Sequence, residues 1–146
     1  MDKQNKKKVV VYAIQNNKLL VFRHVDFSYE EVGLQVPAGS VEENESLEVA
    51  ALRELTEETG LKDFEIIAYL GSSNYDISPY RNEIQERHFY LAKTTKELPE
   101  RWFSREDHDG VGEPTKFECF WVPLERGHIV QSGQSVFIWK VQEFLK

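Results

Sequence analysis

Residues 39–61 read GSVEENESLEVAALRELTEETGL and contain the strongest helical pattern in the chain. Apolar residues recur every four positions at Leu47, Ala51 and Leu55, which places them on one face of an α-helix. Asn44 or Ser46 can cap the start of this helix, and Gly60 can end it, because glycine adopts the left-handed conformation at low cost. We therefore expect a helix over Ser46–Thr59.

The C-terminal half of this helix concentrates negative charge. Glu54, Glu57 and Glu58 share one side of the helix, because residues three or four apart are neighbours on a helix surface. Each like-charge pair costs roughly 0.2–0.5 kcal/mol, and carboxylates in the last turn also oppose the helix dipole. Arg53 is the nearest compensating charge. Either the cluster is a solvated acidic face, or a divalent cation such as Mg²⁺ relieves the repulsion.

The spacing of the segment resembles the signature of the Nudix hydrolase family, Gly-x₅-Glu-x₇-Arg-Glu-U-x-Glu-Glu-x-Gly-U, where U is a bulky aliphatic residue. The matching positions are Gly39, Glu45, Arg53, Glu54, Leu55, Glu57, Glu58, Gly60 and Leu61. The order of the surrounding elements is also similar to that of the family. The resemblance implies an α+β Nudix fold, an α/β/α sandwich around a mixed β-sheet, in an enzyme that hydrolyses a phosphoanhydride bond.

The resemblance also implies a cofactor and its ligands. Glu54, Glu57 and Glu58 are expected to hold Mg²⁺ or Mn²⁺, with the carbonyl of Ala38 as a further ligand. A cation that bridges phosphate oxygens neutralises their charge and lowers the pKa of bound water. The expected catalytic residues are these three glutamates and Arg53.

The resemblance also implies structural roles for Arg53 and the two glycines of the motif. Arg53 is expected to orient the glutamates through a charge-assisted contact and to reach Glu45. Gly39 is expected to let the loop turn tightly, and Gly60 to end the helix without the steric cost of a Cβ atom.

A carboxylate must accept the proton of the attacking water. The candidates for this general base are Glu54, Glu113 and Glu118. Glu118 lies in an otherwise apolar strand, so it is either a binding residue for substrate or a solvent-facing strand position. By resemblance, Arg23 is a candidate contact for a substrate phosphate, with a surface ion pair as the alternative.

The rest of the chain reads as strands, connecting loops and a closing helix. We expect strands at Val9–Ile14, Leu19–His24, Phe64–Leu70, Glu86–Lys93 and Thr115–Val122. Gly71–Gln85 reads as a loop that can hold some extended structure, Thr94–Glu113 as a loop with a turn at Asp107–Gly110, and Gln134–Leu145 as a helix. No repeat or linker interrupts the pattern, so residues 1–146 are interpreted as a single domain of the α+β class.

The composition of the chain argues against some classes of binding partner. The net charge of −7 argues against duplex nucleic acid as a ligand, because such binding depends on lysine and arginine meeting phosphates. Apolar runs such as Val9–Ile14 are too short to cross a bilayer, and the single cysteine, Cys119, can form no intrachain disulfide. We expect a cytoplasmic protein without a membrane partner, acting on a small nucleotide-type molecule, with a homodimer left open.

The substrate subclass is not decided by the motif. Ala38 stands where many nucleotide-pool-cleaning members have glycine, which is more like members acting on ADP-sugars, but Pro79 lies later than the proline of that group. Tyr75 and Tyr80 do not match the tyrosine of dinucleoside polyphosphate hydrolases well. The leading hypothesis is hydrolysis of a nucleoside diphosphate derivative. The alternatives are a housecleaning pyrophosphohydrolase for modified nucleoside triphosphates and a non-catalytic nucleotide-binding module, which the intact acidic residues disfavour.

Overall fold

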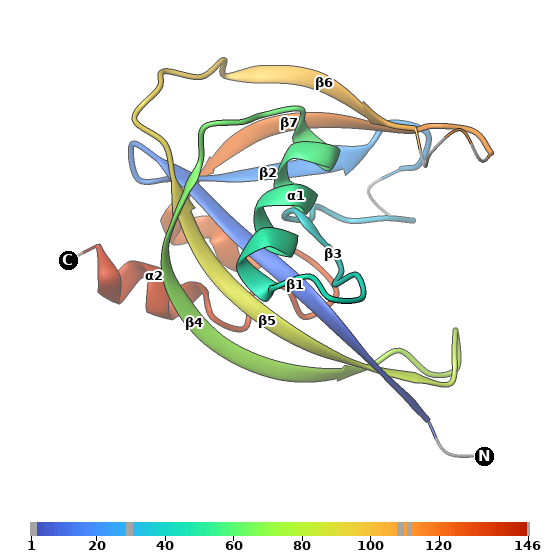
Figure 1. Ribbon diagram of the computed structural model, residues 1–146. Helices are drawn as coiled ribbons and strands as arrows, with labels where there is room; N and C mark the ends of the chain where they lie inside the picture. The colour runs from blue at the N-terminus through green and yellow to red at the C-terminus, as the bar shows by residue number, and fades with distance from the viewer. Residues whose placement is uncertain (1–2, 29–30, 108–109, 111, 146) are drawn as a thin grey trace.

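The computed structural model describes residues 3–28, 31–107, 110 and 112–145, and its strands form one mixed sheet (Figure 1). The strands are β1 (Gln4–Gln15), β2 (Lys18–His24), β3 (Ala38–Ser40), β4 (Glu65–Asp76), β5 (Glu83–Lys93), β6 (Arg101–Glu106) and β7 (Thr115–Pro123). Their order across the sheet is β4-β5-β1-β2-β7-β6, and β3 also pairs with β1. β1 and β5 run parallel, whereas the other pairs are antiparallel.

One edge of strand β1 pairs with β5, and its other edge has two different neighbours. Its C-terminal end pairs with β2 through the tight turn after Gln15, whereas Lys8 to Val10 pair with β3. The segment before β3 fits between the separating strands, since the Pro37 carbonyl accepts from Val11 N–H. This divergence brings β3, which begins the acidic motif, next to the middle of the sheet.

Helices cover both faces of the sheet. Helix α1 (Leu47–Thr59) buries Ala50, Ala51 and Leu55 against one face, and Figure 1 shows it crossing in front of β1. On the opposite face, the 3-10 helix η2 (Leu124–Ile129) and helix α2 (Ile138–Phe144) bury residues such as Leu124 and Val141 against a second apolar cluster. The predicted α+β sandwich around a mixed sheet is therefore confirmed.

Helix α1 begins and ends where its sequence predicts. The Ser46 side chain accepts a hydrogen bond from Val49 N–H, and Gly60 has a φ of 75° while its N–H donates to the Thr56 carbonyl. The predicted strands are also present, most of them longer than expected, because cross-strand pairing continues into polar residues at their ends. No helix among the described residues is long and apolar enough to span a membrane.

Three predicted segments differ from the structure. The loop expected over Thr94–Glu113 contains strand β6, which pairs with β7 along its whole length. Most of Gly71–Gln85 is strand, because β4 and β5 extend together as a long antiparallel pair. The terminal helix begins at Ile138 instead of Gln134, since the backbone before it forms turns. The turn expected at Asp107–Gly110 includes positions outside the described residues.

Candidate metal centre

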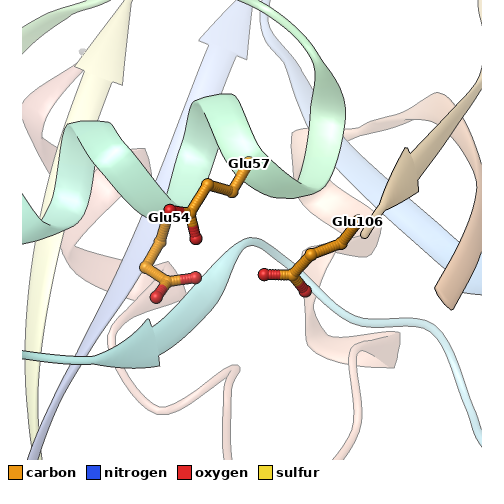
Figure 2. A group of neighbouring side chains, drawn as sticks. All are labelled: Glu54, Glu57 and Glu106. Carbon is orange, nitrogen blue, oxygen red and sulfur yellow. The ribbon is translucent and has the colours of Figure 1, made fainter. Parts of the chain in front are cut away.

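Three carboxylates from two elements converge at one point. Glu54 and Glu57 come from α1, and Glu106 comes from the end of β6 (Figure 2). A ligand oxygen of each lies within 4.8 Å of the others. The group lines a cavity of about 600 Å³. Two of the three glutamates predicted as metal ligands therefore meet a third carboxylate that the sequence did not suggest.

Contacts between α1 and β6 bring Glu106 to this point. Trp102 Nε1 donates to the Thr59 carbonyl at 2.8 Å, and Ser104 Oγ donates to the Glu58 carbonyl. Because side chains alternate along a strand, Glu106 lies on the same side as these two residues and faces the helix. The alternation of Trp102, Ser104 and Glu106 is the sequence signal that could have revealed the strand and its carboxylate.

Burial makes the charge of Glu54 costly. Only 8% of the residue is exposed, and this desolvation, with repulsion from Glu57, raises the Glu54 pKa to about 7 against the opposing effect of Arg53. Desolvation likewise raises the pKa of Glu58 well above its ordinary value, although the Ala38 N–H lowers it. A cation among these groups would favour their ionised forms, which is the property expected of a metal site.

Arg53 forms hydrogen bonds with three glutamates of the motif. Its Nε and a terminal nitrogen donate to both oxygens of Glu45, at 2.7 and 2.9 Å, so the predicted contact with Glu45 is present. The other terminal nitrogen donates to Glu54 at 2.9 Å and to Glu57 at 3.2 Å. These bonds to Arg53 are also the main reason that the Glu45 pKa falls to about 2. Arg53 thus connects the loop before α1 to the carboxylates of Glu54 and Glu57.

Gly39 is needed for space, not for the predicted tight turn. It lies in β3 without a left-handed backbone, and a Cβ atom added there would stand 2.1 Å from the Glu54 carboxyl carbon. Any larger residue must therefore displace that carboxylate. The glycine and the glutamate of the motif are linked by direct contact across the fold.

The substitution Gly39→Ala is expected to weaken Mn²⁺ binding by roughly 10- to 100-fold, because the new methyl group pushes the Glu54 carboxylate out of position. The metal-free melting temperature should change little, since the displaced group is the end of a flexible side chain. Calorimetric titration with Mn²⁺ and a thermal melt in EDTA measure the two quantities. Unchanged Mn²⁺ affinity would contradict the role given to this contact.

Glu58 and Ala38 adjoin the carboxylate group without belonging to it. Ala38 N–H donates to Glu58 Oε1 at 2.7 Å, which joins β3 to the last turn of α1. Both residues line a second cavity, of about 210 Å³, which Gly39 also lines. The predicted ligand set is thus divided between two neighbouring cavities.

The other predicted residues lie elsewhere. Glu118 accepts from Arg23 Nε at 2.5 Å and from Arg101 at 2.6 Å, and these bonds lower its pKa. Arg23 and Glu118 are direct partners across β2 and β7, so the ion-pair alternative for Arg23 is present. Only 8% of Glu118 is exposed, so it is not the solvent-facing strand position given as its alternative. Glu113 is exposed beside a separate cavity of about 250 Å³ that also includes His24.

Known proteins resemble this chain in sequence and in fold. A family model described as "NUDIX domain" matches residues 4–136. A protein named RNA pyrophosphohydrolase from Brucella abortus (strain 2308) is 29% identical over 97 residues, covering 62% of this chain and 54% of the relative. The chain therefore matches only about half the length of this relative, and the same holds for its counterparts in other Brucella species.

Solved structures share the fold at low sequence identity. A MutT NUDIX hydrolase from Burkholderia pseudomallei superposes with a TM-score of 0.65 at 19% identity, covering 95% of this chain and 99% of the other. The C. elegans Ap4A hydrolase has a TM-score of 0.64 at 18% identity, covering 100% of both chains. At this level of identity the similarity concerns the arrangement of the backbone.

Proposed function

Since this chain belongs to the Nudix family, as its acidic motif predicted, we propose that it is a pyrophosphohydrolase that cleaves a phosphoanhydride bond in a nucleoside diphosphate derivative. The observation that carries the proposal is the convergence of Glu54, Glu57 and Glu106 on one cavity, with Glu54 desolvated. Glu54 is buried, whereas Glu57 is exposed and Glu106 half-buried, so a cation held here would offset the desolvation of Glu54 and the repulsion among the three carboxylates.

The proposed cofactor is Mg²⁺ or Mn²⁺. Both ions prefer carboxylate and carbonyl oxygens, so the donor set of Glu54, Glu57 and Glu106 fits them. Glu58 and the carbonyl of Ala38, which adjoin the group, are proposed to contribute from the neighbouring cavity. When bound, the ion supplies charge neutralisation at the phosphates and a more acidic water.

The side chains have distinct proposed tasks. Among the three candidates for general base, Glu54 belongs to the carboxylate group that would hold the cation and the attacking water. Glu113 and Glu118 lie outside the group, so we assign proton acceptance to Glu54. Arg53 holds Glu54 and Glu57 in place, and Arg23 is a positioning residue for Glu118 unless a substrate phosphate displaces that pair.

The experiment that tests the function is a hydrolysis assay with a substrate panel. The panel contains ADP-ribose, diadenosine polyphosphates, modified nucleoside triphosphates and an RNA with a 5′-triphosphate, since the Brucella relative is named for RNA. We expect metal-dependent release of products cut at a pyrophosphate bond, abolished by EDTA. Preference for a modified triphosphate would favour the housecleaning alternative. Binding without cleavage of any member would leave only the non-catalytic alternative.

The predictions of a single domain, a cytoplasmic location and a homodimer stay predictions.

Metal binding is expected to stabilise the protein more strongly at pH 8 than at pH 6. The folded-state pKa of Glu54 is raised, so its protonated form stabilises the fold below its ordinary pKa near 4.5, and this contribution is lost as pH rises through about 7. Above that pH the ionised group needs the cation. At a Mn²⁺ concentration 100 times the Kd, the melting temperature should rise by roughly 5–10 °C at pH 8. Thermal melts with and without Mn²⁺ at both pH values measure this, and an equal rise at pH 6 would contradict it.

A further inference from the structure

The cavity lined by Gly39 and Glu58 has a different electrostatic character from the acidic cavity at Glu54 and Glu57. Its volume is about 210 Å³, and its polar lining includes Lys8, Gln85, Arg87 and Gln134 together with the carboxyl group of Glu58. A protein with a net charge of −7 therefore places two cations beside its candidate metal centre. Neither Lys8 nor Arg87 belongs to the acidic motif at residues 39–61.

The sheet register forces the two cations together. Lys8 on β1 and Arg87 on β5 are direct partners in the parallel ladder, and Lys8 is also the partner of Ser40 on β3. Like charges at paired positions of neighbouring strands are destabilising. Two cations are thus held at adjacent positions at the junction of the acidic motif and the central sheet.

Arg87 carries its charge in a buried position. Only 7% of the residue is exposed, and within the described part of the chain no carboxylate forms an ion pair with it or with Lys8. Its guanidinium donates to Gln85 Oε1 at 3.0 Å and to the Ser132 carbonyl, and stacks 4.1 Å from the centre of the Tyr75 ring. A buried guanidinium with only neutral partners gains strongly from an anionic ligand.

The oxygens of the neighbouring amides each accept a hydrogen bond from the protein, and the Gln85 NH₂ donates to Glu83 Oε2 at 3.4 Å. Gln85 Oε1 is taken by Arg87 Nε, and Gln134 Oε1 accepts from Val36 N–H at 2.8 Å. Both donors are obligatory N–H groups, so the amide oxygens are fixed toward them. The polar group that Gln134 can offer a ligand is therefore its NH₂. With the ammonium of Lys8 and the guanidinium of Arg87, this side of the cavity is complementary to an acceptor-rich, negatively charged group.

We propose that this cavity is a subsite for a substrate phosphate outside the scissile linkage, bound by Lys8 and Arg87. The inference rests on the proposed function, because it places the phosphate next to the carboxylates that would hold the cation. It narrows the substrate class to molecules with a chain of more than two phosphates, or with a separate phosphate near the diphosphate. Conjugates whose only anionic groups are the two linked phosphates leave the subsite without its ligand.

The test compares two substrates that differ only in phosphate number, P1,P4-diadenosine tetraphosphate and P1,P2-diadenosine diphosphate, with Mn²⁺. In Arg87→Gln, the ratio of kcat/KM for the tetraphosphate to kcat/KM for the diphosphate should fall by roughly 10- to 100-fold, mainly through KM. Lys8→Gln should lower the ratio in the same direction. Arg126→Gln, which replaces an exposed arginine on η2, is the matched control and should leave the ratio unchanged.

A binding measurement separates this inference from the proposed function. Calorimetric titration with tripolyphosphate in EDTA should give a Kd at least tenfold weaker for Arg87→Gln than for the unsubstituted protein. If the unsubstituted protein cleaves nothing but shows this difference, the proposed function fails and the subsite stands. An unchanged substrate ratio in both variants overturns the subsite, as does inorganic phosphate competing as strongly as tripolyphosphate. Where Arg87→Gln does not fold, Lys8→Gln decides by the same criteria.

Discussion

Replacing Glu54 with glutamine is expected to lower kcat/KM for a pyrophosphate substrate by roughly 10²- to 10⁴-fold. Glutamine keeps the shape of the side chain but has no negative charge to bind a cation and cannot accept the proton of water. The site depends on this charge because Glu54 is the buried member of the carboxylate group. Initial rates at saturating Mg²⁺ or Mn²⁺ measure the effect.

The controls for this substitution use the same helix. Glu48→Gln changes an exposed glutamate in the first turn of α1 and should leave the rate within about threefold of the unsubstituted protein.

Glu58→Gln should lower turnover by orders of magnitude, as expected for a residue next to the carboxylates that would hold the cation. The metal-free melting temperature of Glu54→Gln should not fall, because the change removes a desolvated carboxyl. Near-normal turnover of Glu54→Gln would remove this residue from the mechanism.

Replacing Arg53 with lysine is expected to lower kcat/KM by roughly 10- to 100-fold and to destabilise the fold by about 1–3 kcal/mol. Arg53 uses three nitrogens at once, to hold Glu45 by both oxygens and to reach Glu54 and Glu57. It also donates to the Ser40 carbonyl at 2.8 Å. A lysine is a single point of charge that cannot reproduce this planar arrangement. Steady-state kinetics and urea denaturation measure the two effects.

The matched control for Arg53→Lys is Arg105→Lys. Arg105 lines the same acidic cavity but is exposed and pairs with Asp107 at 3.0 Å. Its replacement should change the free energy of unfolding by no more than about 0.5 kcal/mol. Equal losses in the two variants would mean that general positive charge near the cavity matters, and not the specific geometry of Arg53.

Local sequence information was sufficient for the helix and its acidic face. The period of Leu47, Ala51 and Leu55, the Ser46 cap and the Gly60 terminator are all interactions within a few residues, so pattern alone predicts them. The same spacing placed Glu54 and Glu57 on one side of the helix. Family resemblance then supplied the chemistry that the repulsion between these carboxylates only suggested.

Contacts between residues far apart in the sequence could not be predicted in this way. Glu106 joins the site because β6 pairs with β7 and packs on α1, and neither of these partners can be read from the sequence of β6 alone, even though its alternation suggests a strand. Lys8 and Arg87 meet only through the register of β1 and β5, which nothing in either segment specifies alone. The contact between Gly39 and Glu54 likewise depends on how β3 meets α1, so the reason for the glycine could not be predicted correctly.

Anomalous X-ray diffraction from crystals containing Mn²⁺ addresses the metal centre most directly. We expect an anomalous peak within coordination distance of carboxylate oxygens of Glu54, Glu57 and Glu106, at the point where Figure 2 shows them facing one another. Crystals saturated with Mn²⁺ that show no peak there, with these side chains turned toward solvent, would contradict the account.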